Sequence, residues 1–393
     1  MITHEDQKFM KTPTAKLLLT AAVCSFVLSG CINNSPAPEK IEIKAENKLK
    51  AGYYVDNGSR SNGVFQWAQL LFYSPQLDVT LLMAEDIRAG KLDGLDLLII
   101  PGGSSASQVE ALQDDGKKKI QEFVRNGGAY VGICAGFHCT LDRKERLQIM
   151  PYKYLPGAGG AAAKLAIDLS EKGGKILGVK SGRYYVRYSR GPISKPSSWE
   201  HGKAETLGVY KGTVGPHGKP GGHFFDAPAV IYGNYGKGKV IATSFHPESH
   251  VNNHAMAMGL IYAVTGVKPT PVFPKRNYRP VRVAFITHTT IGKEPIKRML
   301  ELDAHSDIDV ILTGDFSEGI LRHVDVLVVP DAIDIKNINL AKNSKEYLNE
   351  FLNNGGKILV SGSEAKAFPK HRNVVEIPAG KSFVEEVLKK PIR

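Results

Sequence analysis

From residue 49 onward, short unbroken apolar runs alternate with helix-periodic stretches along the chain. The predicted strands are 51–55, 77–83, 95–100 and 129–131, and the predicted helices between them are 64–72 and 117–125. The run 95–100 is apolar after Asp96, as expected for a strand that is buried on both faces. This alternation predicts an α/β fold with a doubly wound parallel sheet that carries helices on both faces.

The following region, residues 150–235, is richer in Tyr, Gly and Pro and has shorter β-like runs such as 183–188. Near its end, residues 229–232 and 239–244 form two apolar runs that are joined through Gly236-Lys237-Gly238. This pattern is typical of a β-hairpin.

Prolines recur through residues 268–280, which can continue neither a helix nor a central strand, so we place a domain boundary there. Beyond it the earlier pattern returns in the same order and at nearly constant spacing. The matching segments are 77–79 with 308–310, 95–101 with 324–330, and 123–128 with 351–356. We therefore expect residues 281–393 to be a second, smaller and degenerate copy of the first domain, although any two doubly wound domains share some of this pattern.

The longest apolar stretch, residues 17–28, is too short to span a bilayer, which takes roughly 20 helical residues. It follows Lys11 and Lys16 and is typical of a signal peptide. It ends in Leu28-Ser29-Gly30-Cys31, which resembles the lipobox of bacterial lipoproteins, where the cysteine is lipidated and becomes the first residue after cleavage. The predicted segments are a signal peptide at 1–30, a tether at 31–48, a first α/β domain at 49–267, a linker at 268–280 and a second α/β domain at 281–393.

The resemblance to lipoproteins implies attachment to a membrane through lipid on Cys31. The next residue is Ile32 rather than Asp, which by similarity to Gram-negative sorting implies the periplasmic face of the outer membrane, in the cell envelope. Translation from Met10 gives a more typical start than a segment containing Glu5 and Asp6, so both Met1 and Met10 remain open as starts.

Charge and composition narrow the function classes. The chain has 393 residues, 42% of them hydrophobic, and a net charge of +12, which fits a globular protein and excludes a disordered one. The positive charges are scattered and are not interleaved with aromatic residues, so we expect no nucleic-acid partner. With Cys24 in the signal peptide and Cys31 lipidated, only Cys134 and Cys139 remain, which excludes a disulfide framework.

One of these cysteines lies in a pattern that suits a nucleophile. Gly132-Ile133-Cys134-Ala135-Gly136 follows a predicted strand and precedes a predicted helix, the context of a nucleophile elbow. His246 and Glu248 follow another strand, so His246 is the candidate base and Glu248 the group that orients its imidazole. A third strand ends at Pro101-Gly102-Gly103, and the amides of Gly102, Gly103 and Ala135 are candidates for an oxyanion hole.

These motifs resemble the class I glutamine amidotransferase superfamily, which has a G-x-C-x-G elbow and a later H-P-E. The segments 99–103, 126–136 and Tyr188-Ser189-Arg190-Gly191-Pro192 look more narrowly like the domain named for the N-terminal region of biotin-protein ligase, over about residues 49–265. The resemblance implies a flavodoxin-like sheet and a Cys134-His246-Glu248 site. It implies no ligase activity by itself.

The sequence departs from that superfamily at His138, where glutaminases usually carry a Gln that helps to hold the substrate. An exported protein is also separated from the cytosolic ATP that an amidotransferase's partner synthetase uses. The second domain has Gly362 in place of the nucleophile. Two hypotheses follow: a cysteine-dependent hydrolase that cleaves an amide or peptide through a thioester at Cys134, or a catalytically silent envelope lipoprotein whose pocket binds a ligand or partner.

Several other residues have weaker patterns. Cys139 is interpreted as a packing residue on the helix after the elbow rather than as a resolving thiol. His246, His250 and His254 recur every four residues, but His246 is expected to end a strand, so we predict no metal site and no cofactor. Residues 157–162 are interpreted as a loop, and the stretch with His217 and His223 as a surface loop, with a lid over the site as the alternative.

Overall fold

The computed structural model describes residues 48–59, 62–155, 162–198, 203–214, 224–274, 281–287, 291–303, 305–312, 320–330, 344–361, 368–378 and 381–389. The expected signal peptide, Cys31 and the tether up to residue 47 lie outside these residues. So do residues 157–161, His217, His223 and Gly362. Among the described residues, no helix is both long enough and apolar enough to cross a membrane.

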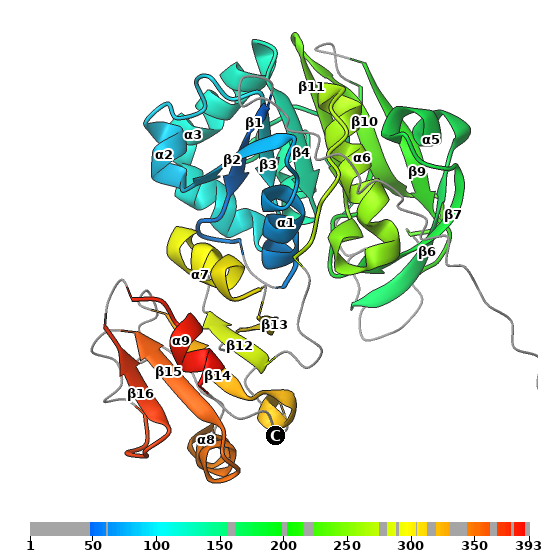
Figure 1. Ribbon diagram of the computed structural model, residues 1–393. Helices are drawn as coiled ribbons and strands as arrows, with labels where there is room; N and C mark the ends of the chain where they lie inside the picture. Colours follow the sequence, from blue (N-terminus) through cyan, green and yellow to red (C-terminus); the bar gives the residue numbers. More distant parts are fainter. Residues whose placement is uncertain are drawn as a thin grey trace, which may run out of the picture. The chain divides into compact units, whose positions relative to one another are not determined.

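A nine-stranded sheet with the strand order β2-β1-β3-β4-β11-β10-β9-β6-β7 forms the larger part of the described chain (Figure 1). Its strands are β1 (Leu49–Tyr54), β2 (Leu77–Leu82), β3 (Leu97–Ile100), β4 (Ala129–Ile133), β6 (Ala163–Leu169), β7 (Gly182–Tyr188), β9 (Ala204–Tyr210), β10 (Pro228–Tyr235) and β11 (Gly238–Thr243). A separate two-stranded ribbon pairs β5 (Tyr152–Tyr154) with β8 (Ser194–Pro196).

The expectation of a doubly wound parallel sheet is correct for one half of this sheet and wrong for the other half. From β2 to β11 neighbouring strands are parallel. From β11 through β10, β9 and β6 to β7 every pairing is antiparallel, so the sheet is mixed. The reason is the short connection between Tyr235 and Gly238, because a tight turn can join only antiparallel strands, whereas parallel neighbours need a crossover. The predicted hairpin itself is confirmed.

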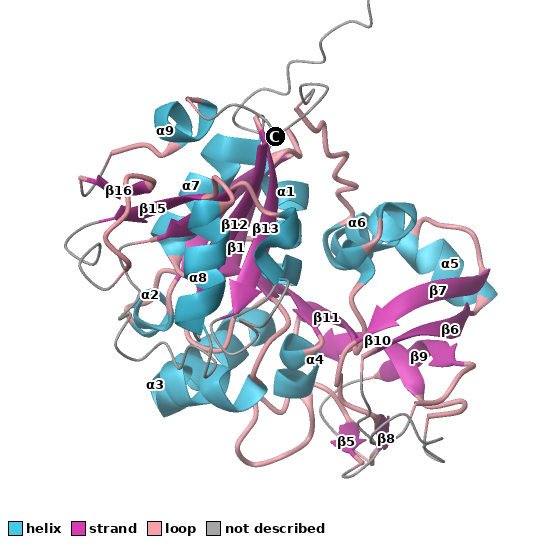
Figure 2. Ribbon diagram, turned by 90° about the horizontal axis from the view of Figure 1, so that it is seen from below, coloured by secondary structure: helices cyan, strands magenta, loops and turns pink. Residues whose placement is uncertain are grey.

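Helices cover both faces of the parallel half, as predicted (Figures 1 and 2). They are α1 (Asn62–Phe72), α2 (Ala84–Arg88), α3 (Ser105–Arg125), α4 (Ala135–Thr140), the short 3-10 helices η3 (Pro247–Ser249) and η4 (Val251–Asn253), and α6 (His254–Thr265). The helix α5 (Glu171–Leu177) lies beside β9 in the other half. Neighbouring residues of a strand point to opposite faces. Tyr53 therefore packs with α1 and α6, whereas Tyr54 packs in a second apolar cluster with α3 and α4.

The second sheet has five strands, all parallel, in the order β13-β12-β14-β15-β16. Its elements are β12 (Val281–Thr287), α7 (Lys293–Asp303), β13 (Ser306–Leu312), η6 (Ile320–His323), β14 (Val326–Val329), α8 (Ser344–Asn353), β15 (Lys357–Ser361), β16 (Val374–Ile377) and α9 (Val384–Leu388). The protein is thus α/β with a mixed nine-stranded sheet and a second, parallel five-stranded sheet.

Side chains of α1 contact the elements after the linker. The fully buried carboxylate of Asp303 accepts hydrogen bonds from Gln69 Nε2 at 2.7 Å and Tyr73 Oη at 2.8 Å. At the other end of α1, the backbone N–H of Val310 on β13 donates to Asn62 Oδ1 at 2.5 Å. The first turn of α1 is therefore tied to the second sheet.

Candidate active site

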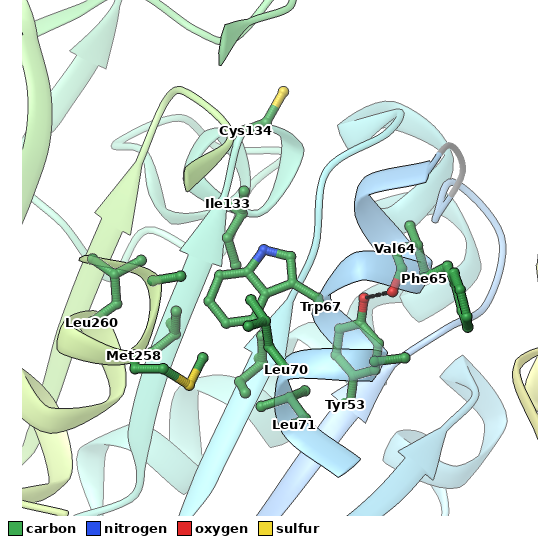
Figure 3. Packing of buried hydrophobic residues seen from close by; sticks show 14 of the residues in the cluster. Tyr53, Val64, Phe65, Trp67, Leu70, Leu71, Ile133, Cys134, Met258 and Leu260 are labelled. Atoms are coloured by element: carbon green, nitrogen blue, oxygen red, sulfur yellow. Dashed lines mark hydrogen bonds between the residues drawn. The ribbon is translucent and has the colours of Figure 1, made fainter. Parts of the chain in front are cut away.

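Cys134 sits on a sharp turn between β4 and α4. Its backbone is in an unusual conformation, with φ of 50° and ψ of −97°, which residues other than glycine rarely adopt. Its N–H donates to the carbonyl of Thr243 at 2.7 Å, which fixes the turn to the end of β11. In Figure 3 the sulfur points away from the apolar cluster formed by Ile133 and Trp67. The predicted elbow therefore has the sharp backbone turn of a nucleophile elbow, and its thiol points away from Ile133 and Trp67 although the residue is only 5% exposed.

The two elbow glycines are required by close backbone contacts. A Cβ on Gly136 would lie 2.0 Å from the carbonyl oxygen of Ile100, and one on Gly132 would lie 2.6 Å from the carbonyl oxygen of Gly136. Only a residue without a side chain fits where the helix starts this close to a neighbouring strand. The G-x-C-x-G pattern is thus explained by packing as well as by chemistry.

His246 and Glu248 form a buried pair just beyond β11. His246 Nδ1 lies 2.7 Å from Glu248 Oε1, and their residues are 7% and 1% exposed. Burial alone lowers the pKa of the imidazole, but the charges of Glu248 and Cys134, together with hydrogen bonds to both, raise it to about 10. The imidazole is therefore protonated at neutral pH, between an acid that orients it and the thiol.

The loop after β3 lies against this pair. A Cβ on Gly102 would be 2.5 Å from His246 Cε1 and 3.5 Å from Cys134 Cβ. Gly103 has a φ of +144°, and the next residue, Ser104, donates its N–H to the carbonyl of Gly58 at 2.8 Å. Gly102 and Ala135, the first residue of α4, thus lie next to Cys134. The amide directions toward a substrate stay a prediction.

Two further segments border the site, and the sequence pattern alone gives neither of them a role. They are residues 189–192 after β7 and the start of α1 at Gly63. Cys134 Sγ lies 3.6 Å from the carbonyl oxygen of Ser189, and Arg190 has a φ of 55°. A Cβ on Gly191 would lie 1.7 Å from the carbonyl oxygen of Ser244. The Ser-Arg-Gly-Pro segment could have been found from the sequence, because it directly follows β7. A turn that follows a strand can lie at the same edge of the sheet as Cys134. Gly63 of α1 offered no such signal, although its Cα faces Glu248 Oε1, which a Cβ there would approach to 2.5 Å.

The remaining cysteine and histidines take other roles. Cys139 is fully buried and donates to Gln108 Oε1 at 3.5 Å, and burial raises its pKa to about 12, so it packs as predicted. His254 Nε2 contacts the carbonyl of Glu248 at 3.1 Å. Within the described part of the chain, no group of three or more His, Cys, Asp or Glu residues is placed to hold a metal ion.

Comparison with protein families finds one match. Residues 72–144 match the family model described as "Biotin-protein ligase, N terminal". The chain therefore contains a domain like the N-terminal region of biotin-protein ligase.

Two curated proteins share shorter stretches of sequence. The biotin–protein ligase of Schizosaccharomyces pombe is 25% identical over 177 residues, which cover 39% of this chain and 25% of the yeast protein. An uncharacterized protein of Chlamydia muridarum is 50% identical over 46 residues, which cover 11% of this chain and 18% of that protein. The chain thus spans a quarter or less of the length of these relatives.

Solved structures with a similar backbone arrangement include a putative GMP synthase component from Thermoplasma acidophilum. Its TM-score is 0.38 at 18% identity, over 55% of this chain and 94% of that one. PurLQS from Thermotoga maritima has a TM-score of 0.42 at 16% identity, over 55% and 98% of the two chains. A beta-galactosidase from Bacillus circulans has a TM-score of 0.39 at 15% identity, over 57% and 32%.

Proposed function

We propose that this protein is a cysteine-dependent hydrolase that cleaves an amide bond through a thioester on Cys134. The observation that carries the proposal is the strained turn at Cys134 beside a buried His246 whose Nδ1 is held by Glu248 at 2.7 Å. His246 lies beside the thiol and can exchange a proton with it, which is the arrangement that a cysteine nucleophile needs. Glu248 is 1% exposed, so its carboxylate holds the imidazole in one orientation.

The chemistry follows from these positions. The Cys134 thiolate attacks the amide carbonyl carbon, and the carbonyl oxygen takes the negative charge next to the amides of Gly102, Gly103 and Ala135. The carbon–nitrogen bond breaks as the imidazolium of His246 gives its proton to the leaving amine. Water then attacks the thioester, the neutral imidazole accepts a proton from that water, and the thiolate and the carboxylic acid product separate. Each proton taken is returned, and no cofactor is required.

The test is the reactivity of Cys134 toward iodoacetamide, followed by mass spectrometry of the labelled peptide. We expect Cys134 to react faster than a free model thiol near pH 7, and His246→Ala to slow it by at least about tenfold. Cys139 is the internal control, because burial makes it inert. The hydrolase proposal fails if Cys134 reacts no faster than Cys139, or if His246→Ala leaves the rate unchanged.

A second candidate function is a catalytically silent pocket that binds a ligand or partner. It is favoured by His138, which stands where glutaminases carry the substrate-holding Gln, as the sequence resemblance implied. The two functions separate when a panel of amides and peptides is tested for turnover with Cys134→Ser as control. Binding that survives this substitution, with no turnover by the unmodified protein, supports the silent pocket.

We also propose that the protein is a lipoprotein of the cell envelope, anchored through Cys31 at the periplasmic face of the outer membrane. The support is the lipobox-like sequence before Cys31 and the Ile at position 32. One acyl chain gives only marginal membrane binding, but the lipobox cysteine of bacterial lipoproteins carries several.

The second sheet is, in this proposal, a degenerate copy of the first. Asp96 accepts the N–H of Lys50 on its carboxylate at 2.9 Å, and its carbonyl accepts the N–H of Ala129 at 2.9 Å. Asp325 makes the equivalent pair of bonds with Arg282 at 3.0 Å and Lys357 at 3.1 Å. The strand orders β2-β1-β3-β4 and β13-β12-β14-β15 also correspond. These shared details of strand joining support duplication beyond the general similarity of doubly wound folds.

A further inference from the structure

A polar cluster of Ser105, His138 and Arg146 lies beside the elbow. His138 is one helical turn after Cys134, and its N–H donates to the carbonyl of Cys134 at 3.0 Å. Ser105 starts α3, two residues after Gly103. The cluster therefore adjoins both the turn at Cys134 and the loop after β3 that contains Gly102 and Gly103.

The three residues are joined to one another. Ser105 Oγ lies 2.9 Å from His138 Nδ1, and Arg146 Nη1 donates to the carbonyl of Ser105 at 2.9 Å. The His138 ring also packs on Tyr154, with 4.7 Å between ring centroids. The positions of the imidazole and the guanidinium are thus fixed by contacts on several sides.

Two side-chain nitrogen atoms of this cluster have no hydrogen-bond partner in the part of the chain that the structure describes. His138 Nε2 and Arg146 Nε are both buried and have no hydrogen-bond partner within the described ranges. Burial and the charges of Arg146 and Arg143 lower the pKa of His138 to about 4, so its imidazole is neutral at pH 7. In the tautomer that carries its proton on Nε2, Nδ1 accepts from the Ser105 hydroxyl and Nε2 is a donor without an acceptor in the described chain.

The positive charge of Arg146 has no acidic partner among the described residues. Its guanidinium is partly buried and forms no ion pair with an acid among the residues that the structure describes, whereas the neighbouring Arg143 is exposed and pairs with Glu145 at 2.7 Å. A partly buried charge without a counter-ion is costly, and a guanidinium matches a carboxylate in both charge and shape.

We propose that Ser105, His138 and Arg146 form a subsite that receives a carboxylate of the substrate, next to the amide bond that Cys134 attacks. The inference rests on the proposed hydrolase function and names its substrate class: acylated compounds or peptides with a free carboxylate close to the scissile bond. Arg146 supplies the charge and His138 a neutral donor.

The test compares two alkylating probes that differ only in charge, N-bromoacetylglycine and its neutral glycinamide counterpart. Each forms a carbon–sulfur bond with Cys134 and releases bromide, and each rate is divided by the rate of the same probe with 2-mercaptoethanol. We expect the full-length protein to prefer the anionic probe by about tenfold, the scale of one hydrogen bond to a charged group. R146Q should abolish the preference, and R146K should keep part of it.

R143Q is the matched control, because it removes the same charge three residues away from an exposed position and should keep the preference. Urea unfolding of each variant checks that it is folded. If R146Q keeps the preference, or R143Q loses it equally, the carboxylate subsite is wrong while the hydrolase proposal stands. If Cys134 reacts with neither probe, both proposals are wrong.

Discussion

The buried imidazole of His246, which Glu248 holds, makes the site sensitive to pH. The pKa of His246 is raised from 6.5 to about 10 in the folded protein, so the native state holds a proton more tightly than the unfolded chain. The resulting stability is fully present below pH 6.5 and is lost as the pH rises toward 10.

The difference in unfolding free energy between the unmodified protein and His246→Asn should therefore shrink between pH 6.5 and 10, as measured by urea denaturation. His254→Asn is the control, because burial lowers the pKa of His254 below 6.5 in the folded protein and so takes its folded-state titration out of this window. A constant difference for His246→Asn across the window would show that its proton is not bound more tightly in the native state.

A substitution at Gly102 tests how closely the loop after β3 packs against His246. A Cβ at this position would lie 2.5 Å from His246 Cε1, so Gly102→Ala must displace the imidazole or the loop. Because displacements of about 1 Å can cost a hundredfold in rate, we expect Cys134 alkylation or turnover to fall by roughly that factor. Unfolding by urea should change little by comparison. Full activity in the variant would place Gly102 outside the site.

At the scale of secondary structure, the start of α4 depends on Gly136. Gly136→Ala would bring a Cβ within 2.0 Å of the Ile100 carbonyl oxygen, which is backbone and cannot rotate away. We expect a loss of about 1–3 kcal/mol in the free energy of unfolding, as for other overpacked cores. Gly208→Ala is the control, because its nearest atom would be 3.4 Å away, an ordinary contact. Equal stabilities of the two variants would contradict this account of the elbow.

The sequence predicts the parallel half of the first sheet well, because buried parallel strands are continuous apolar runs and their helices are periodic. The antiparallel half is harder, since β6 and β9 mix polar and apolar residues and their order depends on pairings far apart in the chain. The same limit applies to the site. Cys134, His246 and Glu248 are recognisable by type and spacing, whereas Gly63 approaches Glu248 only because α1 folds across the sheet.

At the scale of the whole molecule, the lipoprotein proposal concerns where the protein works. Cys31→Ser should leave an uncleaved or mislocalised precursor, because the lipidated cysteine is the attachment point. The folded domains should retain Cys134 reactivity, since the change lies in the leader and tether region. Membrane fractionation with an intact-mass measurement checks both points. Unmodified protein that fractionates as soluble cytosol with its first thirty residues intact would contradict the proposal.

The bond between Asn62 and β13 has a consequence for communication within the chain. The Asn62 side chain accepts from Val310 N–H and donates to Asp309 Oδ1, both at 2.5 Å, and the next residue, Gly63, faces Glu248. This series of contacts predicts a coupling between the thiol and β13, and a coupling between two sites is reciprocal. Carbamidomethylation of Cys134 should alter amide hydrogen exchange in β13, and Asn62→Ala should alter the labelling rate of Cys134 severalfold. The second sheet would then act as an effector domain, through which a molecule bound far from the thiol tunes its reactivity.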